Sequence, residues 1–546
     1  MTDTLEDTSF DVIVIGTGLI ESIVAGSLAR SGKKVLHLDS NQQYGSNWSV
    51  FNFKSLLDWE RQLKSEPLAA KDKVDDGINY AASYNRQFQN VHVRFGQQQQ
   101  QQDSVDEETL KSVIPSTVSA ADIAHYIQPV IDTGHASPDA IAAVVQGLTQ
   151  SRHYNLDTVP KLLPSQGELV ATLIRSGVGR YMEFKSVNDM YVFDQDSGAF
   201  EKVPGSKEDI FVNKSIPLID KRKLMKFLKF TVDEDKDVTL LKGSNYETMT
   251  YAQFLEDRFK ITGKLQKAVI HAISQSRADV AAPQGLERTQ AFMKSMGRFG
   301  KGAYLCTLYG GGSEISQAFC RICAVYGGVY ILGQVLEKYT MDAGKCTGVV
   351  TTDGQAFTAS HIVTGLDYLS SQWDLSSVND HASWVSRAMI VTDKPPPQLA
   401  QEGNQSLSIS VIPPTASNPD LVHVLTQSSE TMACPKDQAV TYLWTPNPDP
   451  SSSSKESIFQ SVTQSLVKDT ESPAHILFEV YYDQRVRSTQ HLDRTKIPAN
   501  IHVYSDPDLS LDFENAILEA KELFYQCVDT TVEFMPREEQ QPMDDD

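Results

Sequence analysis

A short glycine loop near the amino terminus carries the residues whose types and spacing most clearly imply chemistry. Gly16 and Gly18 form a G-x-G directly after the apolar run FDVIVI, and Asp39 follows about twenty positions later. In a dinucleotide-binding unit such glycines let the backbone approach a pyrophosphate, and an acidic residue at that distance binds a ribose hydroxyl. These three residues therefore predict a nucleotide-binding frame.

The third glycine of this fingerprint is replaced by Glu21. The third glycine normally permits close packing of helix on strand, and the pyrophosphate rests on the helix N-terminus, where the helix dipole favours anions. A glutamate there stabilises the helix end and occupies or repels the place of the pyrophosphate. Two like charges in contact cost on the order of 1–4 kcal/mol. We therefore predict the fold without a working flavin or other cofactor.

The elements that must position this loop can be read around it. Residues 10–15 are a continuous β-branched run, typical of a buried parallel strand. An amphipathic stretch follows from Ile23 to Arg30, and Gly32 ends that helix. The run KKVLHLD predicts a second strand that ends at Asp39. Together these elements predict a βαβ unit.

Length and charge limit the class of protein. The chain has 546 residues, which predicts roughly two to four domains, and a formal net charge of −21. An acidic protein lacks the basic face that nucleic acids and anionic membranes attract. No apolar run approaches the ~20 residues of a membrane span, and the N-terminus does not have the pattern of a signal peptide. A cytosolic location is therefore expected.

The fold class expected is α/β: an FAD/NAD(P)-binding, Rossmann-type domain with inserted β-rich segments, plus a smaller helical domain. A glutamine run at 97–102 cannot bury enough apolar area to offset its ordering entropy, so it predicts a tolerated disordered insertion. The expected segments are the first part of the nucleotide-type domain (1–62), a polar insertion (63–150), a largely helical domain (151–300), the rest of the first domain (301–535) and an acidic tail (536–546).

The cysteines and histidines do not predict a metal or catalytic site. Cys320 and Cys323 form a C-x-x-C, but no second pair is present, and residues i and i+3 share one face of a helix. Core packing is therefore favoured over metal or redox chemistry. The twelve histidines are scattered, without an H-E-x-x-H motif, and no G-x-S-x-G is present. We predict no catalytic residues and no metal ligands.

Three ordered blocks carry a family resemblance. They are FDVIVIGTGLIESIVAGSLARSGKKVLHLDSNQQYGSNWS, KLLPSQGELVATLIRSGVGRYMEFK and LYGGGSEISQAFCRICAVYGGVYIL. These blocks resemble signatures of the superfamily of Rab GDP-dissociation inhibitors and Rab escort proteins, in which a glutamate habitually replaces the third glycine. The similarity is scattered over residues 10–60 and 153–365 and is weaker beyond. It implies a binding protein on a flavoenzyme-like scaffold.

The resemblance implies a platform that binds GDP-bound Rab GTPases. Position by position it is carried to Tyr44, Glu314, Arg321, Val329 and Ile331. Glu314 and Arg321 are seven positions apart, about two helical turns, so they can share one face. Val329 and Ile331 would suit the centre of the patch. The alternative is that the charges are ordinary surface groups and that these two aliphatic residues face the core.

Within the superfamily, three features resemble the escort branch. They are the extra length near 62–150, the sequence SNWSVFNF, and the basic amphipathic stretch DKRKLMKFLKF. The last resembles the helix that contacts Rab geranylgeranyltransferase, which implies Phe227 as anchor with Arg222 and Phe230 beside it. An exposed aromatic in a partner's pocket is the usual hot spot. The alternative is that both phenylalanines belong to the core.

An escort protein would be a non-catalytic accessory of the transferase heterodimer. The resemblance implies that it binds unprenylated Rab, presents it for prenylation, covers the geranylgeranyl lipid in a groove of the helical domain, and delivers prenylated Rab by transient contact with membranes. Two alternatives remain open. One is a Rab GDP-dissociation inhibitor, and the other is a flavin-dependent oxidoreductase of the amine-oxidase type, which HIVTG resembles and Glu21 contradicts.

Overall fold

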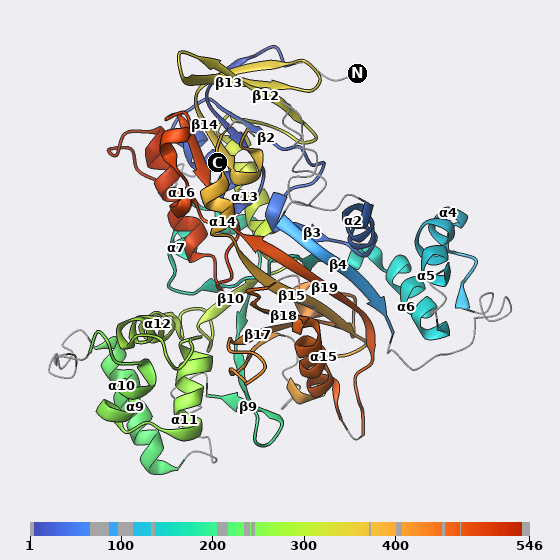
Figure 1. The fold of residues 1–546 in the computed structure, drawn as a ribbon, viewed down its shortest axis with the longest axis vertical. Coiled ribbons are helices and arrows are strands. Elements are labelled where there is room, and N and C mark those ends of the chain that lie inside the picture. Colours follow the sequence, from blue (N-terminus) through green and yellow to red (C-terminus); the bar gives the residue numbers. More distant parts are fainter. Residues whose placement is uncertain are drawn as a thin grey trace, which may run out of the picture.

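The computed structural model describes residues 5–65, 87–96, 113–132, 137–204, 217–233, 241, 246–370, 373–399, 407–449, 454–469 and 471–537. The glutamine run and residues 538–546 of the expected acidic tail lie outside these ranges. The described residues form two large sheets and two small ones, with helices packed around them (Figure 1).

A central sheet of seven strands contains the predicted βαβ unit. Its strands are β1 (Ser9–Ile15), β2 (Val35–Leu38), β11 (Val329–Ile331), β12 (Leu336–Asp342), β13 (Lys345–Thr351), β14 (Ala356–Gly365) and β20 (Ile501–Tyr504). β1 pairs in parallel with β2 and β14, and β11 and β20 extend the parallel arrangement on either side. The hairpin of β12 and β13 adds antiparallel pairing to the first half of β14. The prediction of a Rossmann-type sheet is confirmed.

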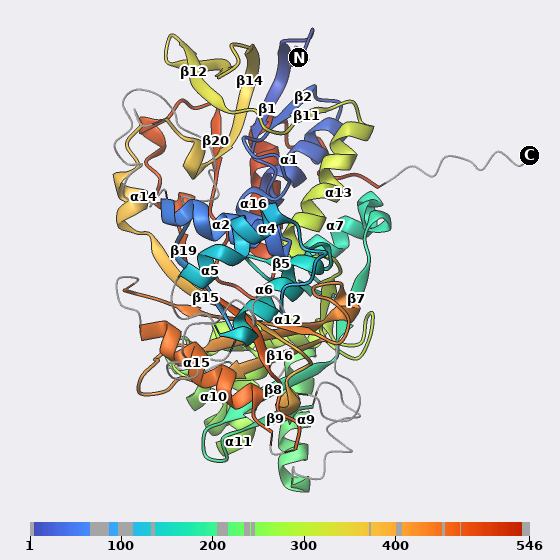
Figure 2. The same ribbon diagram turned by 90° about the vertical axis from the view of Figure 1, so that its right-hand side faces the viewer.

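Alternation along β1 explains how this sheet is covered. Val12 and Val14 enter the core that the covering helices share, whereas Ile13 and Ile15 enter a second core with side chains of β12, β13 and β14. The covering helices are α1 (Leu19–Arg30), α13 (Gly311–Val325) and α16 (Glu514–Cys527). α1 packs against both of the others, so the helix that follows the glycine loop is the centre of this layer (Figure 2).

A second, mostly antiparallel sheet of eight strands lies beside the first. In spatial order its strands are β4 (Phe88–Phe95), β19 (Ile476–Val486), β15 (Ser383–Thr392), β18 (Ala439–Pro446), β17 (Val422–Ser428), β16 (Leu407–Ile412), β8 (Asp189–Asp194) and β9 (Ala199–Val203). The smaller strands are β6 (Leu163–Pro164), β7 (Phe184–Val187), β10 (Tyr304–Thr307), β3 (Val50–Phe51) and β5 (Leu156–Asp157). β10 joins β6 to β7, and β3 pairs with β5.

The remaining helices form two groups (Figure 1). One contains α2 (Phe53–Ser65), α4 (Ala120–Asp122), η4 (Ile123–Ile127), α5 (Gln128–Asp132) and α6 (Pro138–Thr149); the other contains α9 (Leu218–Val232), α10 (Tyr251–Phe259), α11 (Gly263–Lys267), η7 (Ala268–Ile273) and α12 (Ala282–Ser295). Single helices are α7 (Glu168–Ser176), η6 (Val178–Tyr181), α14 (Ser376–Asp380) and α15 (Ser454–Val467). Within the described ranges no helix has the length and hydropathy needed to cross a bilayer.

The expected segment boundaries stay a prediction, to which the structure adds detail. The region 151–300, expected to be largely helical, also contains β7, β8 and β9, and the last two complete the eight-stranded sheet. Within the expected insertion at 63–150, β4 pairs with β19, and the helices α4 to α6 follow. Hydrophobic periodicity does not identify a short apolar strand that is buried only by a partner strand distant in the sequence.

The helix α9 forms where the basic amphipathic stretch predicted it, but its phenylalanines do not face solvent. Phe227 is fully buried and its ring centroid lies 5.0 Å from that of Phe259. Phe230 packs on the same ring at 5.2 Å. The prediction of Phe227 as an exposed transferase anchor, with Phe230 beside it, is therefore wrong, and the alternative of core residues is confirmed. Arg222 does point outward.

Replacing Phe227 with alanine should destabilise the protein by about 3–5 kcal/mol, because the substitution leaves a cavity among aromatic neighbours. The exposed Lys226→Ala on the same helix is the matched control and should change stability by no more than about 0.5 kcal/mol. Denaturant unfolding followed by fluorescence measures both. Equal stabilities of the two variants would contradict the burial of Phe227.

Candidate functional site

The carboxylate of Glu21 lies inside the glycine loop. It is buried, and its Oε1 accepts a hydrogen bond of 2.7 Å from the backbone N–H of Gly18, the residue that caps α1. A Cβ added to Gly16 or to Gly18 would stand 2.7 or 2.6 Å from that same oxygen. Gly16 also has a φ of +100°, which only glycine adopts readily. The glycines thus still provide a close approach, but the anion they receive is the protein's own side chain.

The acidic residue at the ribose position is also fully engaged. Asp39 Oδ2 accepts hydrogen bonds from the Thr17 N–H (2.8 Å), the Thr17 hydroxyl and the Ser46 hydroxyl (2.7 Å). Asp39 Oδ1 accepts from the backbone and side-chain N–H groups of Asn41, both at 2.8 Å. Burial raises the pKa of Asp39, and these hydrogen bonds oppose that shift. A cofactor hydroxyl would therefore have to displace an internal donor.

Two aromatic side chains close the loop from outside it. The Tyr504 hydroxyl lies 3.0 Å from Glu21 Oε1. A Cβ added to Gly16 would stand 2.6 Å from this hydroxyl. Trp48 Cδ1 would stand 3.0 Å from a Cβ on Gly18. Sequence reasoning missed both residues, because Tyr504 reaches the loop only through the pairing of β20 with β14. With Glu21 and Asp39 both satisfied internally, the residues present do not fit a dinucleotide.

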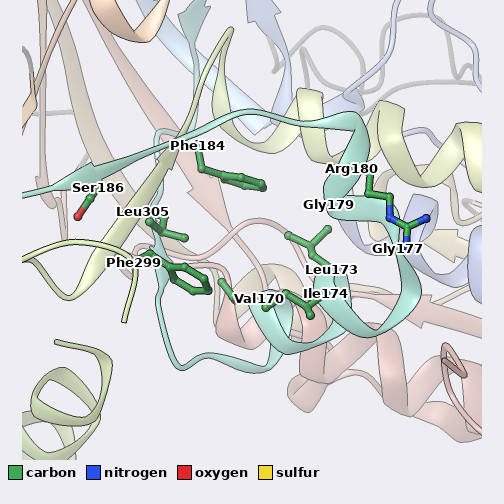
Figure 3. A pocket seen from close by; sticks show the side chains of 10 residues that line it. All are labelled: Val170, Leu173, Ile174, Gly177, Gly179, Arg180, Phe184, Ser186, Phe299 and Leu305. Atoms are coloured by element: carbon green, nitrogen blue, oxygen red, sulfur yellow. The ribbon is translucent and has the colours of Figure 1, made fainter. Parts of the chain in front are cut away.

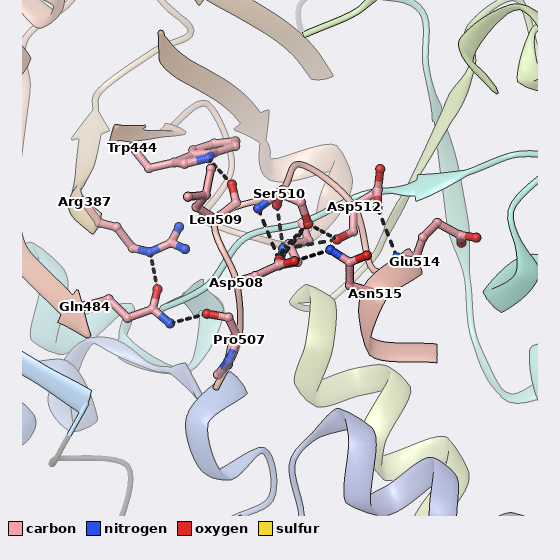
Figure 4. A network of polar contacts seen from close by, with 11 residues as sticks. Arg387, Trp444, Gln484, Pro507, Asp508, Leu509, Ser510, Asp512, Glu514 and Asn515 are labelled. Carbon is pink, nitrogen blue, oxygen red and sulfur yellow. Dashed lines mark hydrogen bonds and ion pairs between the residues drawn. The ribbon is translucent and has the colours of Figure 1, made fainter. Parts of the chain in front are cut away.

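A buried polar network holds the segment that carries Tyr504 and leads into α16 (Figure 4). The Lys161 ammonium donates to the Ser510 carbonyl (2.6 Å) and the Asp512 carbonyl (3.1 Å) and pairs with Asp508. Burial would raise the pKa of Asp508, but Lys161 and other donors lower it to about 2. Trp444 Nε1 donates to the Leu509 carbonyl at 3.2 Å. The segment between β20 and α16 is thereby fixed to β18 of the eight-stranded sheet. This explains how Tyr504 is held over the glycine loop of Gly16 and Gly18, which we call the cradle.

The cysteines of the C-x-x-C are part of the core. Cys320 and Cys323 are both buried and free, and burial raises the pKa of each thiol to about 12. The Cys320 sulfur lies 3.3 Å from the Ser22 hydroxyl, between α13 and α1. The prediction of core packing is confirmed, and these thiols join the helix that bears Glu21 to the helix that bears Glu314 and Arg321.

The candidate platform residues meet around α13. The Ser313 hydroxyl donates to the Tyr44 carbonyl at 3.5 Å, which brings Tyr44 to the first turn of α13 beside the half-buried Glu314. The Tyr44 ring lies 5.9 Å from that of Tyr330. Burial, then Tyr330, raises the pKa of the Tyr44 phenol. The structure thus places Tyr44 against Ser313, the residue before Glu314, and adds Tyr330, which sequence reasoning missed.

Val329 and Ile331 are not the centre of this patch. Both flank Tyr330 on β11, and their half-buried side chains pack against the second core, on the opposite face of the strand from Tyr330. The alternative that they face the core therefore accounts for them better than the prediction does. The large apolar side chains exposed near the ends of α13 and on β11 are Tyr309, Val325, Tyr326 and Tyr330.

Arg321 connects this surface to an apolar cavity. Its guanidinium lies 4.3 Å from the centroid of the Tyr181 ring in η6, a cation–π distance. Arg180, the residue before Tyr181, lines an apolar cavity of about 470 Å³ (Figure 3). Its lining residues are Val170, Leu173, Ile174, Gly177, Gly179, Arg180, Phe184, Ser186, Phe299 and Leu305. Ile174 and Phe299 are 56% and 48% exposed, so two large apolar groups face solvent at its rim.

The geometry defines a class: a protein with a dinucleotide-binding fold, a glycine loop filled by its own side chains, and several exposed tyrosines around α13 and on β11. The sequence profile described as GDI, GDP dissociation inhibitor, matches residues 6–87 and 142–537. The chain therefore belongs to the GDP dissociation inhibitor family, and the resemblance inferred from its motifs is confirmed.

Curated relatives match nearly the whole chain. It is 28% identical to mouse Rab proteins geranylgeranyltransferase component A 2, over 97% of each chain. It is 29% identical to human Rab proteins geranylgeranyltransferase component A 1, over 96% of this chain and 91% of the relative.

Solved structures share the fold. Rab GDI from Plasmodium falciparum superposes with a TM-score of 0.64 at 20% identity, covering 95% of this chain and 98% of that one. An oxidoreductase from Methanosarcina mazei superposes with a TM-score of 0.50 at 12% identity, covering 94% and 99%. The expected fold class, shared with flavin-type oxidoreductases, is thus confirmed.

Burial makes the closed cradle sensitive to pH. Desolvation raises the pKa of Glu21 from 4.5 to about 7, despite the opposing hydrogen bonds from the loop and from Tyr504. Because the folded pKa is raised, the folded protein binds the extra proton in this interval, so stability falls as pH rises from about 4.5 through about 7. Relative to Glu21→Gln, the wild type should lose up to about 3 kcal/mol of stability over that range.

Urea unfolding of both proteins across this pH range measures the difference. Two stability curves that run parallel would contradict a buried, protonatable Glu21. Glu314→Gln is the matched control, since that carboxyl is only half-buried and its pKa is raised by burial alone. It should change the pH dependence much less than Glu21→Gln.

Proposed function

We propose that this chain is a Rab escort protein. It would bind GDP-bound, unprenylated Rab GTPases, present them to the Rab geranylgeranyltransferase heterodimer, and deliver the prenylated Rab to membranes. The names of its near full-length relatives, components A of the transferase, support this role. A frame whose cradle is closed by Glu21 supports a role in binding rather than in cofactor chemistry.

One observation carries the proposal: Arg321 on α13 stacks on Tyr181, and Arg180, the residue before Tyr181, lines the apolar cavity. A globular GTPase seated on Tyr44, Glu314, Arg321 and Tyr330 would have its flexible carboxyl-terminal tail beside the cavity. The aromatic side chains suit the middle of such an interface, where tyrosine and arginine are enriched. A preference for GDP-bound Rab then requires that this surface bind the switch regions more tightly in their GDP-bound conformation than in their GTP-bound conformation.

The cavity suits an apolar segment of the tail or an attached geranylgeranyl chain. Burying an isoprenoid gains about 0.8 kcal/mol per CH₂ removed from water, so even partial cover keeps a lipidated GTPase soluble. The cavity lies against α7, β7 and β10, and all its lining residues except Leu305 fall in the segment 151–300, where the groove was expected. The apolar wall of the cavity is made by buried side chains, among them Val170, Leu173 and Leu305.

The transferase would dock on the outer face of α9. Because Phe227 and Phe230 are core residues, the contact must use what α9 exposes. Leu218 and Ile219 are 63% and 67% exposed at the start of the helix, and Arg222 and Lys226 follow on the outside. Two adjacent exposed aliphatic side chains beside a cation suit a docking surface. Holding Rab and transferase together raises the local concentration of the tail at the active site.

A Rab GDP-dissociation inhibitor is the second candidate. The family description and the superposition on the Plasmodium Rab GDI favour it. The two functions differ in one partner, because an inhibitor has no need to bind the transferase. The exposed face of α9 is therefore the part of the molecule that separates them.

Prenylation of a purified Rab by the transferase should depend on this protein. With Rab and geranylgeranyl diphosphate at fixed concentration, lipid incorporation should rise with added wild-type chain and fail to rise with Arg222→Glu, which reverses the charge on α9. Arg222→Glu should still bind Rab. Equal lipid incorporation with and without the chain would remove the escort role and leave the inhibitor as the better reading.

Arg321→Ala should weaken Rab binding by about 5- to 30-fold, since interface arginines commonly contribute about 1–2 kcal/mol. Arg321 is exposed, so the fold should remain intact. Calorimetric titration of GDP-bound Rab measures the affinity, with Arg222→Ala as the matched control. If both variants bind Rab as the wild type does, the α13 surface is not the platform.

A further inference from the structure

His361, His502 and Cys527 form a cluster that the proposed function does not use. His361 lies on β14, His502 on the neighbouring strand β20, and Cys527 is the last residue of α16. Their ligand atoms all lie within 4.8 Å of one another. His361 Nδ1 and His502 Nε2 are 2.9 Å apart, and the two rings stack with centroids at 5.2 Å. These three residues are brought together by the sheet pairing and by the end of the helix that covers it.

The hydrogen bonds around His502 leave a lone pair directed into the cluster. Its Nδ1 donates to Gln526 Oε1 at 2.9 Å, so in the neutral ring Nε2 is the acceptor nitrogen. That nitrogen faces His361 Nδ1. Fixing one ring nitrogen with an outer hydrogen bond is how proteins orient a histidine that ligates a metal.

We infer that His361, His502 and Cys527 form a zinc-binding site. Tetrahedral zinc with bonds of about 2.0–2.1 Å to nitrogen sets two nitrogens about 3.3 Å apart, close to the 2.9 Å seen here. Two imidazoles and a thiolate are the donor set for zinc, whereas magnesium and calcium take oxygen ligands. The three side chains supply three protein ligands, which leaves the fourth position of tetrahedral zinc for a further ligand such as water. The ion would tie the end of α16 to β14 and β20.

Binding must release one proton for each zinc. The Cys527 thiol loses its proton when the Zn–S bond forms, because the thiolate is the ligand. His361 stays neutral, with its proton moving from Nδ1 to Nε2, and His502 keeps its Nδ1 proton on Gln526. No oxidant or reductant is needed, since zinc does not change its oxidation state.

Cobalt substitution tests the site in the full-length, reduced protein. Co²⁺ added to the wild type should give a near-ultraviolet thiolate-to-cobalt charge-transfer band that saturates at one ion per chain and is displaced by Zn²⁺. Cys527→Ser should abolish the band. Cys346→Ser, the matched control at a buried thiol outside the cluster, should retain it. No band in the wild type, or equal loss in both serine variants, would overturn the assignment.

Two milder variants keep the test decisive if Cys527→Ser does not fold. His361→Gln changes a half-buried proposed ligand, and Gln526→Ala removes the hydrogen-bond acceptor of His502 Nδ1 at an exposed position. Loss of the outer hydrogen bond should lower zinc affinity by about 10- to 100-fold. Competition with a chromophoric chelator measures both variants. Zinc affinities equal to that of the wild type in both would show that the metal binds elsewhere.

Discussion

The hydrogen bond from the Gly18 N–H to the Glu21 carboxylate is the interaction around which the amino-terminal half of the molecule is arranged. It caps α1 from within, so the helix needs no external anion at its N-terminus. Because the same oxygen lies within 3.0 Å of the Tyr504 hydroxyl, the cap also ties the first βαβ unit to β20, almost five hundred residues later in the chain. A cofactor that usually joins such segments is replaced by a side chain.

Closing the cradle has a consequence for the surface above it. Helices α1 and α13 pack tightly, with Cys320 and Ser22 in contact between them, so α13 presents a fixed outer face. Tyr44 is held against the first turn of this helix, and Arg321 lies two turns further along, stacked on Tyr181. A rigid surface loses little conformational entropy when a partner binds, which suits a protein that works by contact.

The polar network around Lys161 completes this arrangement from the other side. An ammonium group buried among carbonyl oxygens and the Asp508 carboxylate is costly unless every donor is satisfied, and here Ser510 and Asp512 supply the acceptors. The network fixes the loop between β20 and α16, and α16 in turn packs on α1 and α7. The glycine loop, the candidate platform on α13 and the wall of the cavity therefore share one support.

The sequence alone determined the βαβ unit, the family and the closure of the cradle. These depend on local relations: a G-x-G, a glutamate three residues after the helix cap, and an aspartate at the end of the next strand, whose geometry follows from backbone spacing. Tertiary structure decided which face of α9 is covered, so that Phe227 is core, and which side of β11 faces outward, so that Tyr330 replaces Val329 and Ile331. It also decided that Tyr504 seals the loop and that His361, His502 and Cys527 meet. An amphipathic pattern identifies apolar residues, but only contacts between distant segments determine which of them lose water.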